Sequence, residues 1–139
     1  MTANALQKDV AREVSHGNQS LAAARALHAL SLFNDALGRT YYAAFHLATA
    51  LLLTEGVEPK RHRALPGLLV SHLGEAGFDA GDAARLARLA TYRDMADYER
   101  AFDANAELVE DALRDAETFI EKSLACLRAR GALANDSAG

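Results

Sequence analysis

The chain has 139 residues, which is enough for one domain with a substantial core and too few for a second. Half of the residues are apolar, Ala and Leu dominate, and only two prolines are present, so the composition favours an all-α domain. The formal net charge of −4 excludes a surface that is basic throughout, so any contact with RNA or DNA needs a local basic patch.

The hydrophobic pattern predicts five helices, at about 5–30, 35–54, 62–73, 82–98 and 105–130. We expect a kink at His16-Gly17-Asn18 in the first helix, and Asn34 as the N-cap of the second. The second helix is apolar nearly all round in its second half and should be the most buried. Long helices with short connections predict an antiparallel bundle over residues 1–131, followed by a flexible tail at 132–139.

The single cysteine, Cys126, excludes an intrachain disulfide and a cysteine-based zinc site, and suits a reducing cytoplasm. No apolar run approaches the roughly 20 residues that a membrane span needs, and the N-terminus lacks the pattern of a signal peptide. We therefore expect a cytoplasmic protein with no membrane partner.

An arginine and a histidine share one face of the second helix. Arg39 and His46 are seven residues apart, which is close to two helical turns and about 10 Å along the axis, and Tyr42 lies between them on nearly the same stripe. A long cation and a titratable ring suit binding and cleaving a phosphodiester. The alternative for His46 is a core histidine bonded to a backbone carbonyl or a carboxylate.

Two further segments carry candidate residues, each with a structural alternative. Lys60-Arg61-His62-Arg63 is the only dense basic cluster, and it suits either a polyanion or a solvated loop. Arg93 can pair with Asp97 one turn later, so it is either part of a polar cluster at the end of its helix or part of a phosphate site. Tyr41 is interpreted as a packing residue.

The segment from Asn34 to His46 resembles the second-helix signature of HEPN domains. Leu51 to Gly56 ends that helix in the same way, Lys60-Arg61-His62 resembles the Lys-x-His of the following loop, and the segment from Arg93 to Tyr98 resembles Arg-x-x-Ala-Asp-Tyr. Together the four segments cover about residues 23–98. In this order they are similar to the segments of the small stand-alone HEPN proteins.

The resemblance implies a helical bundle that forms a homodimer. Many HEPN proteins are metal-independent ribonucleases with an Arg/His pair, and many are toxins encoded beside a minimal nucleotidyltransferase that neutralises them. In several nuclease groups the Arg/His motif lies later, near 93–98, where this chain has Asp97 and Tyr98 and no histidine. Either Arg39 and His46 have taken over the role, or the fold is kept without cleavage.

These considerations predict an endoribonuclease with Arg39 and His46 as catalytic residues. The substrate-binding candidates are Tyr42, Lys60, His62 and Arg93. The resemblance also makes Tyr98 a candidate for adenylation by the nucleotidyltransferase. We expect no cofactor, and no metal site, because no histidine and carboxylate show a convincing ligand spacing and His16, His28 and His72 read as structural. The alternative is a binding module for a nucleotide or a protein partner, without catalysis.

Overall fold

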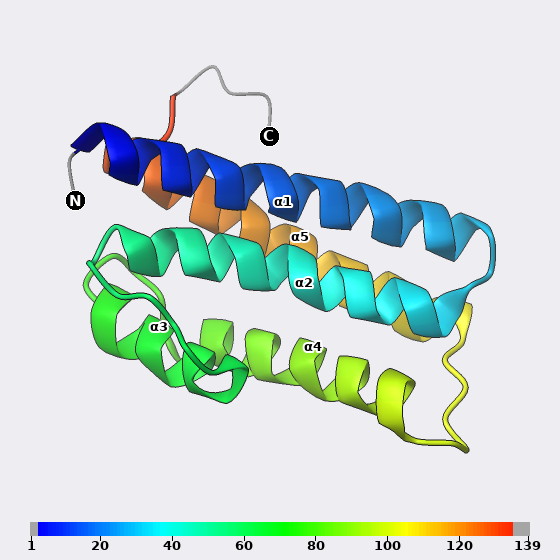
Figure 1. Ribbon diagram of the computed structural model, residues 1–139. Coiled ribbons are helices and arrows are strands. Elements are labelled where there is room, and N and C mark those ends of the chain that lie inside the picture. The colour runs from blue at the N-terminus through cyan, green and yellow to red at the C-terminus, as the bar shows by residue number, and fades with distance from the viewer. Residues whose placement is uncertain (1–2, 135–139) are drawn as a thin grey trace.

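The computed structural model describes residues 3–134, and over that range it contains helices and no strand (Figure 1). The elements are α1 (Ala3–Ala29), α2 (Phe33–Leu53), the 3-10 turn η1 (His62–Ala64), α3 (Leu65–Leu73), α4 (Ala80–Tyr98) and α5 (Ala106–Ala129). The prediction of an all-α bundle of five helices is confirmed.

α1 and α2 form a long antiparallel hairpin that shares the most extensive interface in the bundle (Figure 1). The expected kink is wrong, because α1 is one continuous helix through Gly17. This glycine allows a close approach of α2. A Cβ at Gly17 would lie 2.4 Å from Leu47 Cδ2 and 3.2 Å from the Ala43 carbonyl oxygen. The small residue therefore serves packing between helices and does not bend α1.

Asn34 does not cap α2, contrary to our expectation. Leu32 is the N-cap residue, and Asn34 lies inside the first turn, where its side chain faces the α4–α5 connection. The Asn34 amide donates to the Phe102 carbonyl at 3.1 Å, and its oxygen accepts from the Ala104 N–H at 2.9 Å. The side chain therefore satisfies backbone groups of a loop that is distant in sequence.

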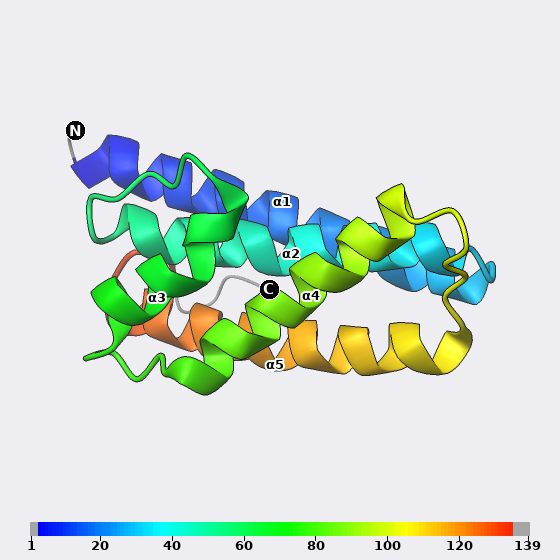
Figure 2. The ribbon, with the colours of Figure 1, turned by 90° about the horizontal axis from the view of Figure 1, so that it is seen from below.

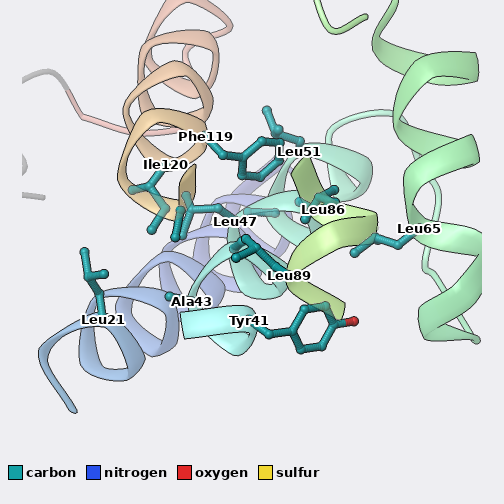
Figure 3. Packing of buried hydrophobic residues seen from close by; sticks show 14 of the residues in the cluster. Leu21, Tyr41, Ala43, Leu47, Leu51, Leu65, Leu86, Leu89, Phe119 and Ile120 are labelled. Carbon is teal, nitrogen blue, oxygen red and sulfur yellow. The ribbon is translucent and has the colours of Figure 1, made fainter. Parts of the chain in front are cut away.

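α2 is the centre of the molecule and has more buried residues than any other described helix, as the sequence predicted. Figure 3 shows Leu47 and Leu51 of α2 packed against Phe119 of α5 and Leu86 of α4. Figure 2 shows α4 running obliquely across the bundle, in contact with both α2 and α5. α1 and the α3–α4 pair therefore lie on different sides of α2 (Figure 1).

α3 begins at Leu65, later than the predicted His62. Pro66 occupies its first turn, where the missing N–H has no helical partner to lose. The three residues before it form the turn η1. The loop after α2 thus folds back along the bundle, and η1 places His62 beside the middle of α2. This position decides the architecture of the site.

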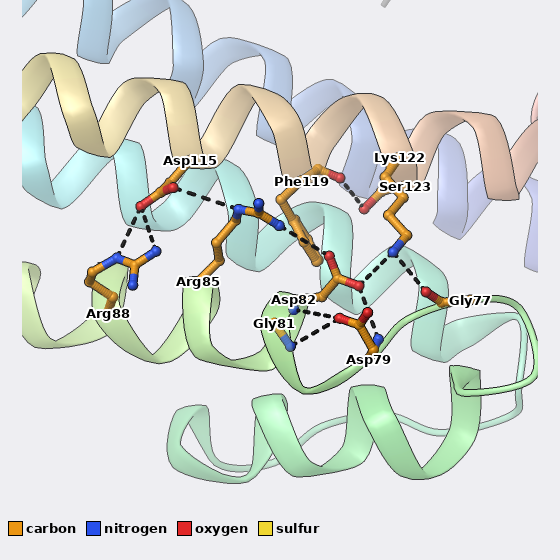
Figure 4. A network of polar contacts seen from close by, with 10 residues as sticks. All are labelled: Gly77, Asp79, Gly81, Asp82, Arg85, Arg88, Asp115, Phe119, Lys122 and Ser123. Carbon is orange, nitrogen blue, oxygen red and sulfur yellow. Dashed lines mark hydrogen bonds and ion pairs between the residues drawn. The ribbon is translucent and has the colours of Figure 1, made fainter.

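A polar network joins the start of α4 to α5 (Figure 4). Asp79 caps α4 in a capping box with Asp82, and the buried Asp82 carboxylate pairs with Lys122 at 2.6 Å and with Arg85 at 3.3 Å. Asp115 of α5 completes the network through Arg85 and Arg88. Because a buried carboxylate is costly without partners, these contacts fix α4 against α5.

Only part of the expected tail falls within the described residues. Ala132 and Leu133 pack against the core, and 135–139 lie outside the described range. No helix within residues 3–134 combines the length and the apolarity needed to cross a membrane.

Candidate functional site

Six of the seven predicted site residues are divided among three open cavities, and Lys60 lines none of these three. His62, Arg93 and Tyr98 share one of about 570 Å³ between α2, α3 and α4, which we call the His62 cleft. Its lining residues are Tyr41, His62, Arg63, Pro66, Ala87, Ala90, Thr91, Arg93, Asp94, Tyr98 and Glu99. Segments separated by more than 20 residues in sequence therefore meet in this cleft.

His62 is held in place by two aromatic residues of α2. Its Nδ1 lies 2.8 Å from the Tyr41 hydroxyl oxygen, and its ring stacks on Phe45 with centroids 4.3 Å apart and planes inclined by 4°. The Tyr41 ring is almost completely buried, and in Figure 3 its oxygen points away from Leu47 and Leu89. Tyr41 therefore packs in the core and also anchors the His62 imidazole.

The surroundings favour a neutral His62. Partial desolvation of this exposed side chain lowers its pKa below the ordinary value of 6.5, and the nearby charge of Arg93 lowers it further, while Asp94 acts in the opposite direction. Burial raises the pKa of Tyr41 to about 12, so its hydroxyl keeps its proton at neutral pH. In the tautomer with the proton on Nδ1, His62 donates to the Tyr41 oxygen, and Nε2 keeps a free lone pair.

Arg93 brings positive charge to the cleft. The predicted pair with Asp97 is present, with Nε 3.1 Å from Oδ2, and Nη1 lies 3.6 Å from Asp94 Oδ1. The Nε–Asp97 contact lacks hydrogen-bond alignment, and this buried Nε has no hydrogen-bond partner among the described residues. The guanidinium carbon also lies 5.3 Å from the Tyr42 ring centroid. An anion in the cleft must therefore bind the terminal nitrogens of Arg93, because its Nε is buried.

Arg39 and His46 line a different cavity, of about 430 Å³, between α1 and α2. His46 Nδ1 lies 2.7 Å from Glu13 Oε2, so a carboxylate fixes the ring. A histidine bonded to a carboxylate was the structural alternative that the sequence left open. Arg39 is exposed and makes no hydrogen bond or ion pair with any residue in 3–134. It also borders a third cavity, where it meets Tyr42.

The remaining two candidates are exposed side chains. Lys60 is exposed and does not line these three cavities. Tyr98 is 73% exposed and stands at the rim of the His62 cleft. No site role was predicted for Tyr41, which was interpreted as a packing residue, or for Glu13. For Glu13 a signal existed, since Glu13 and His16 share a face of α1 at a spacing of three residues.

The fold and the cleft define a small all-α domain with arginine and histidine side chains in open cavities on both sides of its central helix. The HEPN domain matches residues 12–127, which is most of the chain. The protein therefore belongs to the HEPN domain family, as its motifs suggested.

Several archaeal proteins are similar to it. A protein of Archaeoglobus fulgidus named "UPF0332 protein" is 32% identical over 94 residues, which is 68% of this chain and 75% of that protein. The Methanocaldococcus jannaschii protein named "Putative toxin MJ0605" is 43% identical over 61 residues, 41% of this chain and 46% of its own length. A second protein of that organism, "Putative toxin MJ0142", is 24% identical over 118 residues, 84% and 80% of the two chains.

Proposed function

We propose that this protein is a toxin-like endoribonuclease that cleaves RNA without a metal in the His62 cleft. One observation carries the proposal. Three segments that resemble HEPN motifs converge there, with Tyr41 bonded to His62 and Arg93 near the Tyr41 ring in the same cleft. The relatives named as toxins support the class of function.

In the proposed reaction His62 Nε2 takes the proton of a ribose 2′-hydroxyl, whose oxygen then attacks the neighbouring phosphorus. Arg93 binds the phosphate and stabilises the charge that grows on its oxygens. The bond to the 5′-oxygen breaks, this oxygen takes a proton, and a 2′,3′-cyclic phosphate and a 5′-hydroxyl result. A second histidine supplies that proton when two copies face each other in the homodimer that we propose.

Arg39 and His46, the catalytic pair predicted from the sequence, form the alternative site of the same reaction. Glu13 orients His46, and Arg39 in the same cavity is free to bind a phosphate. Because the pairs line different cavities, single substitutions distinguish them. His62→Ala and Arg93→Ala report on one cavity, and His46→Ala and Arg39→Ala on the other.

The test is incubation of the wild type and these four variants with tRNA and total RNA in EDTA. We expect wild-type fragments that end in 2′,3′-cyclic phosphate, and a loss of about 10²-fold or more for His62→Ala and Arg93→Ala. Loss in the Arg39 and His46 variants alone would place catalysis in the other cavity. Circular dichroism of each variant controls for loss of helix.

A binding module without catalysis is the second candidate. The acidic net charge and the absence of a histidine from the segment Arg93 to Tyr98 favour it. This candidate predicts intact RNA after long incubation with wild type whose mass shows no modification, together with saturable binding of a nucleotide in a titration.

We further propose that a minimal nucleotidyltransferase neutralises the protein by attaching adenylate to Tyr98. The exposure of this side chain at the rim of the cleft supports the proposal, because an added nucleotide there would obstruct entry of RNA. Incubation with ATP and such an enzyme should add one adenylate to the wild type and none to Tyr98→Phe. Equal labelling of both would exclude Tyr98 as the acceptor.

A further inference from the structure

We propose that Glu13, His16 and His46 form a binding site for a divalent metal ion of the zinc class, between α1 and α2. The three side chains each offer one ligand atom, and these atoms all lie within 4.8 Å of one another. The His16 and His46 rings meet edge to face with centroids 5.4 Å apart, and Glu13 contacts His46 at 2.7 Å.

The helix geometry explains why these groups converge. Glu13 and His16 are three residues apart and project from the same face of α1, while His46 faces them from α2. Gly17 lies next to them, packed closely against α2, and a Cβ added there would come within 3.4 Å of His46 Cβ. The missing side chain at Gly17 thus lets the two helices bring a two-histidine, one-carboxylate set together.

The ligand set selects the class of ion. Two imidazoles and one carboxylate match three-ligand zinc sites, whereas Mg²⁺ and Ca²⁺ prefer more oxygen ligands. Zinc–ligand bonds of about 2.0–2.1 Å at tetrahedral angles require donor atoms about 3.3 Å apart. The three ligand atoms lie within 4.8 Å of one another, so rotation of the side chains must bring them to this separation.

The adjacent cavity supplies the fourth position. His16 and His46 line it together with Gln19, Ser20 and Arg39, so the ion can keep a water or bind a small anion beside the guanidinium. The site faces α1, whereas the His62 cleft lies between α2, α3 and α4. The inference therefore stands apart from catalysis in the His62 cleft, whose assay contains EDTA, although it shares His46 with the alternative site.

The test uses the full-length protein, freed of any histidine tag and of metal, in a titration with Co²⁺ followed by competition with Zn²⁺. We expect one equivalent of Co²⁺ with the visible absorption of a tetrahedral site, and displacement by Zn²⁺. Zn²⁺ should also raise the Tm, because an ion that binds only the folded state stabilises it. Titration without saturation at one equivalent would overturn the proposal.

The variants locate the site. His16→Ala removes an exposed ligand without disturbing the core, so it should fold normally and weaken binding at least tenfold. Glu13→Gln should act similarly. His28→Ala is the matched control, because His28 pairs with Glu110 at 3.4 Å and belongs to no three-ligand group within residues 3–134. Wild-type affinity in His16→Ala, or an equal loss in His28→Ala, would refute the assignment.

Discussion

His62 shows how single residues set the chemistry of the cleft. Partial desolvation and the charge of Arg93 both lower its pKa, so we expect NMR to find the His62 titration midpoint below 6.5. Arg93→Gln removes one of these causes, and the midpoint should then rise toward 6.5 without reaching it, because desolvation is the larger cause. An unchanged midpoint in this variant would mean that Arg93 does not act on His62.

The same shift has a consequence for stability. The folded-state pKa lies below the unfolded value, so the unfolded chain binds more protons in between. The stabilisation from a neutral His62 is complete above the unfolded value and is lost as the pH falls through 6.5 toward the folded pKa. Activity that uses His62 as a base should be lost at lower pH, as the folded ring becomes protonated.

The Tyr41 hydroxyl gives a second test at this scale. Tyr41→Phe keeps the buried ring and removes the bond to His62, so we expect a loss of about 0.5–1.5 kcal/mol in unfolding free energy. RNA cleavage should also fall, because the imidazole loses its orientation. Urea unfolding and the RNA assay measure the two effects. Tyr42→Phe is the control, since the Tyr42 hydroxyl has no hydrogen-bond partner in the described chain, and it should leave stability unchanged.

The candidate residues could be identified from the sequence more easily than the cavities in which the fold brings them together. Arg39 and His46 lie on one helix face, so helical spacing was enough to place both beside the same cavity. His62 and Tyr41 meet only because the loop after α2 turns back along the bundle. No periodicity encodes such a path, so Tyr41 looked like a core residue and His62 like part of a loop at the opposite end of the helix.

Among the elements, the α1–α2 hairpin depends on Gly17. Gly17→Ala forces a Cβ against the fully buried Leu47 side chain and the Ala43 carbonyl oxygen, and overpacking of this kind costs about 1–3 kcal/mol, against roughly 1 kcal/mol gained in helix propensity. We expect a net destabilisation by urea unfolding. Gly38→Ala is the matched control on α2: a Cβ there meets nothing within 4 Å, so the variant should be stabilised by up to about 1 kcal/mol. Stabilisation of both variants would show that the helices can separate without cost.

The helices themselves were predictable, because each has an apolar stripe with helical spacing and a stop signal. Gly56 and Gly131 have positive φ values at the ends of α2 and α5, where the sequence placed those stops. The errors concern residues whose local preference yields to a tertiary contact. Asn34 has the side chain of a cap, but it bonds to the loop before α5. Gly17 was expected to kink α1, but its missing side chain instead allows α2 to pack closely against α1.

For the whole molecule, RNA binding must overcome a net charge of −4. Arg63 and Arg93 line the His62 cleft. Lys60 and Arg61 immediately precede His62 in the sequence. If all four contact phosphates of a single strand, the slope of log K against log salt concentration should be about −2.8, from about 0.7 per contact. The slope can be measured with an RNA oligonucleotide and the His62→Ala variant, which prevents cleavage during the titration.

Removing one contact should change that slope in a position-dependent way. Lys60→Ala should reduce its magnitude by about 0.7, because one fewer counterion is released from the RNA. Lys8→Ala, which removes an equally exposed cation from α1, should leave the slope unchanged. Equal effects of the two substitutions would mean that RNA responds to total charge and not to the cleft. A slope near zero would exclude phosphate contacts as the source of binding, because such contacts release counterions. An acidic protein can attract a polyanion only where its cations are gathered.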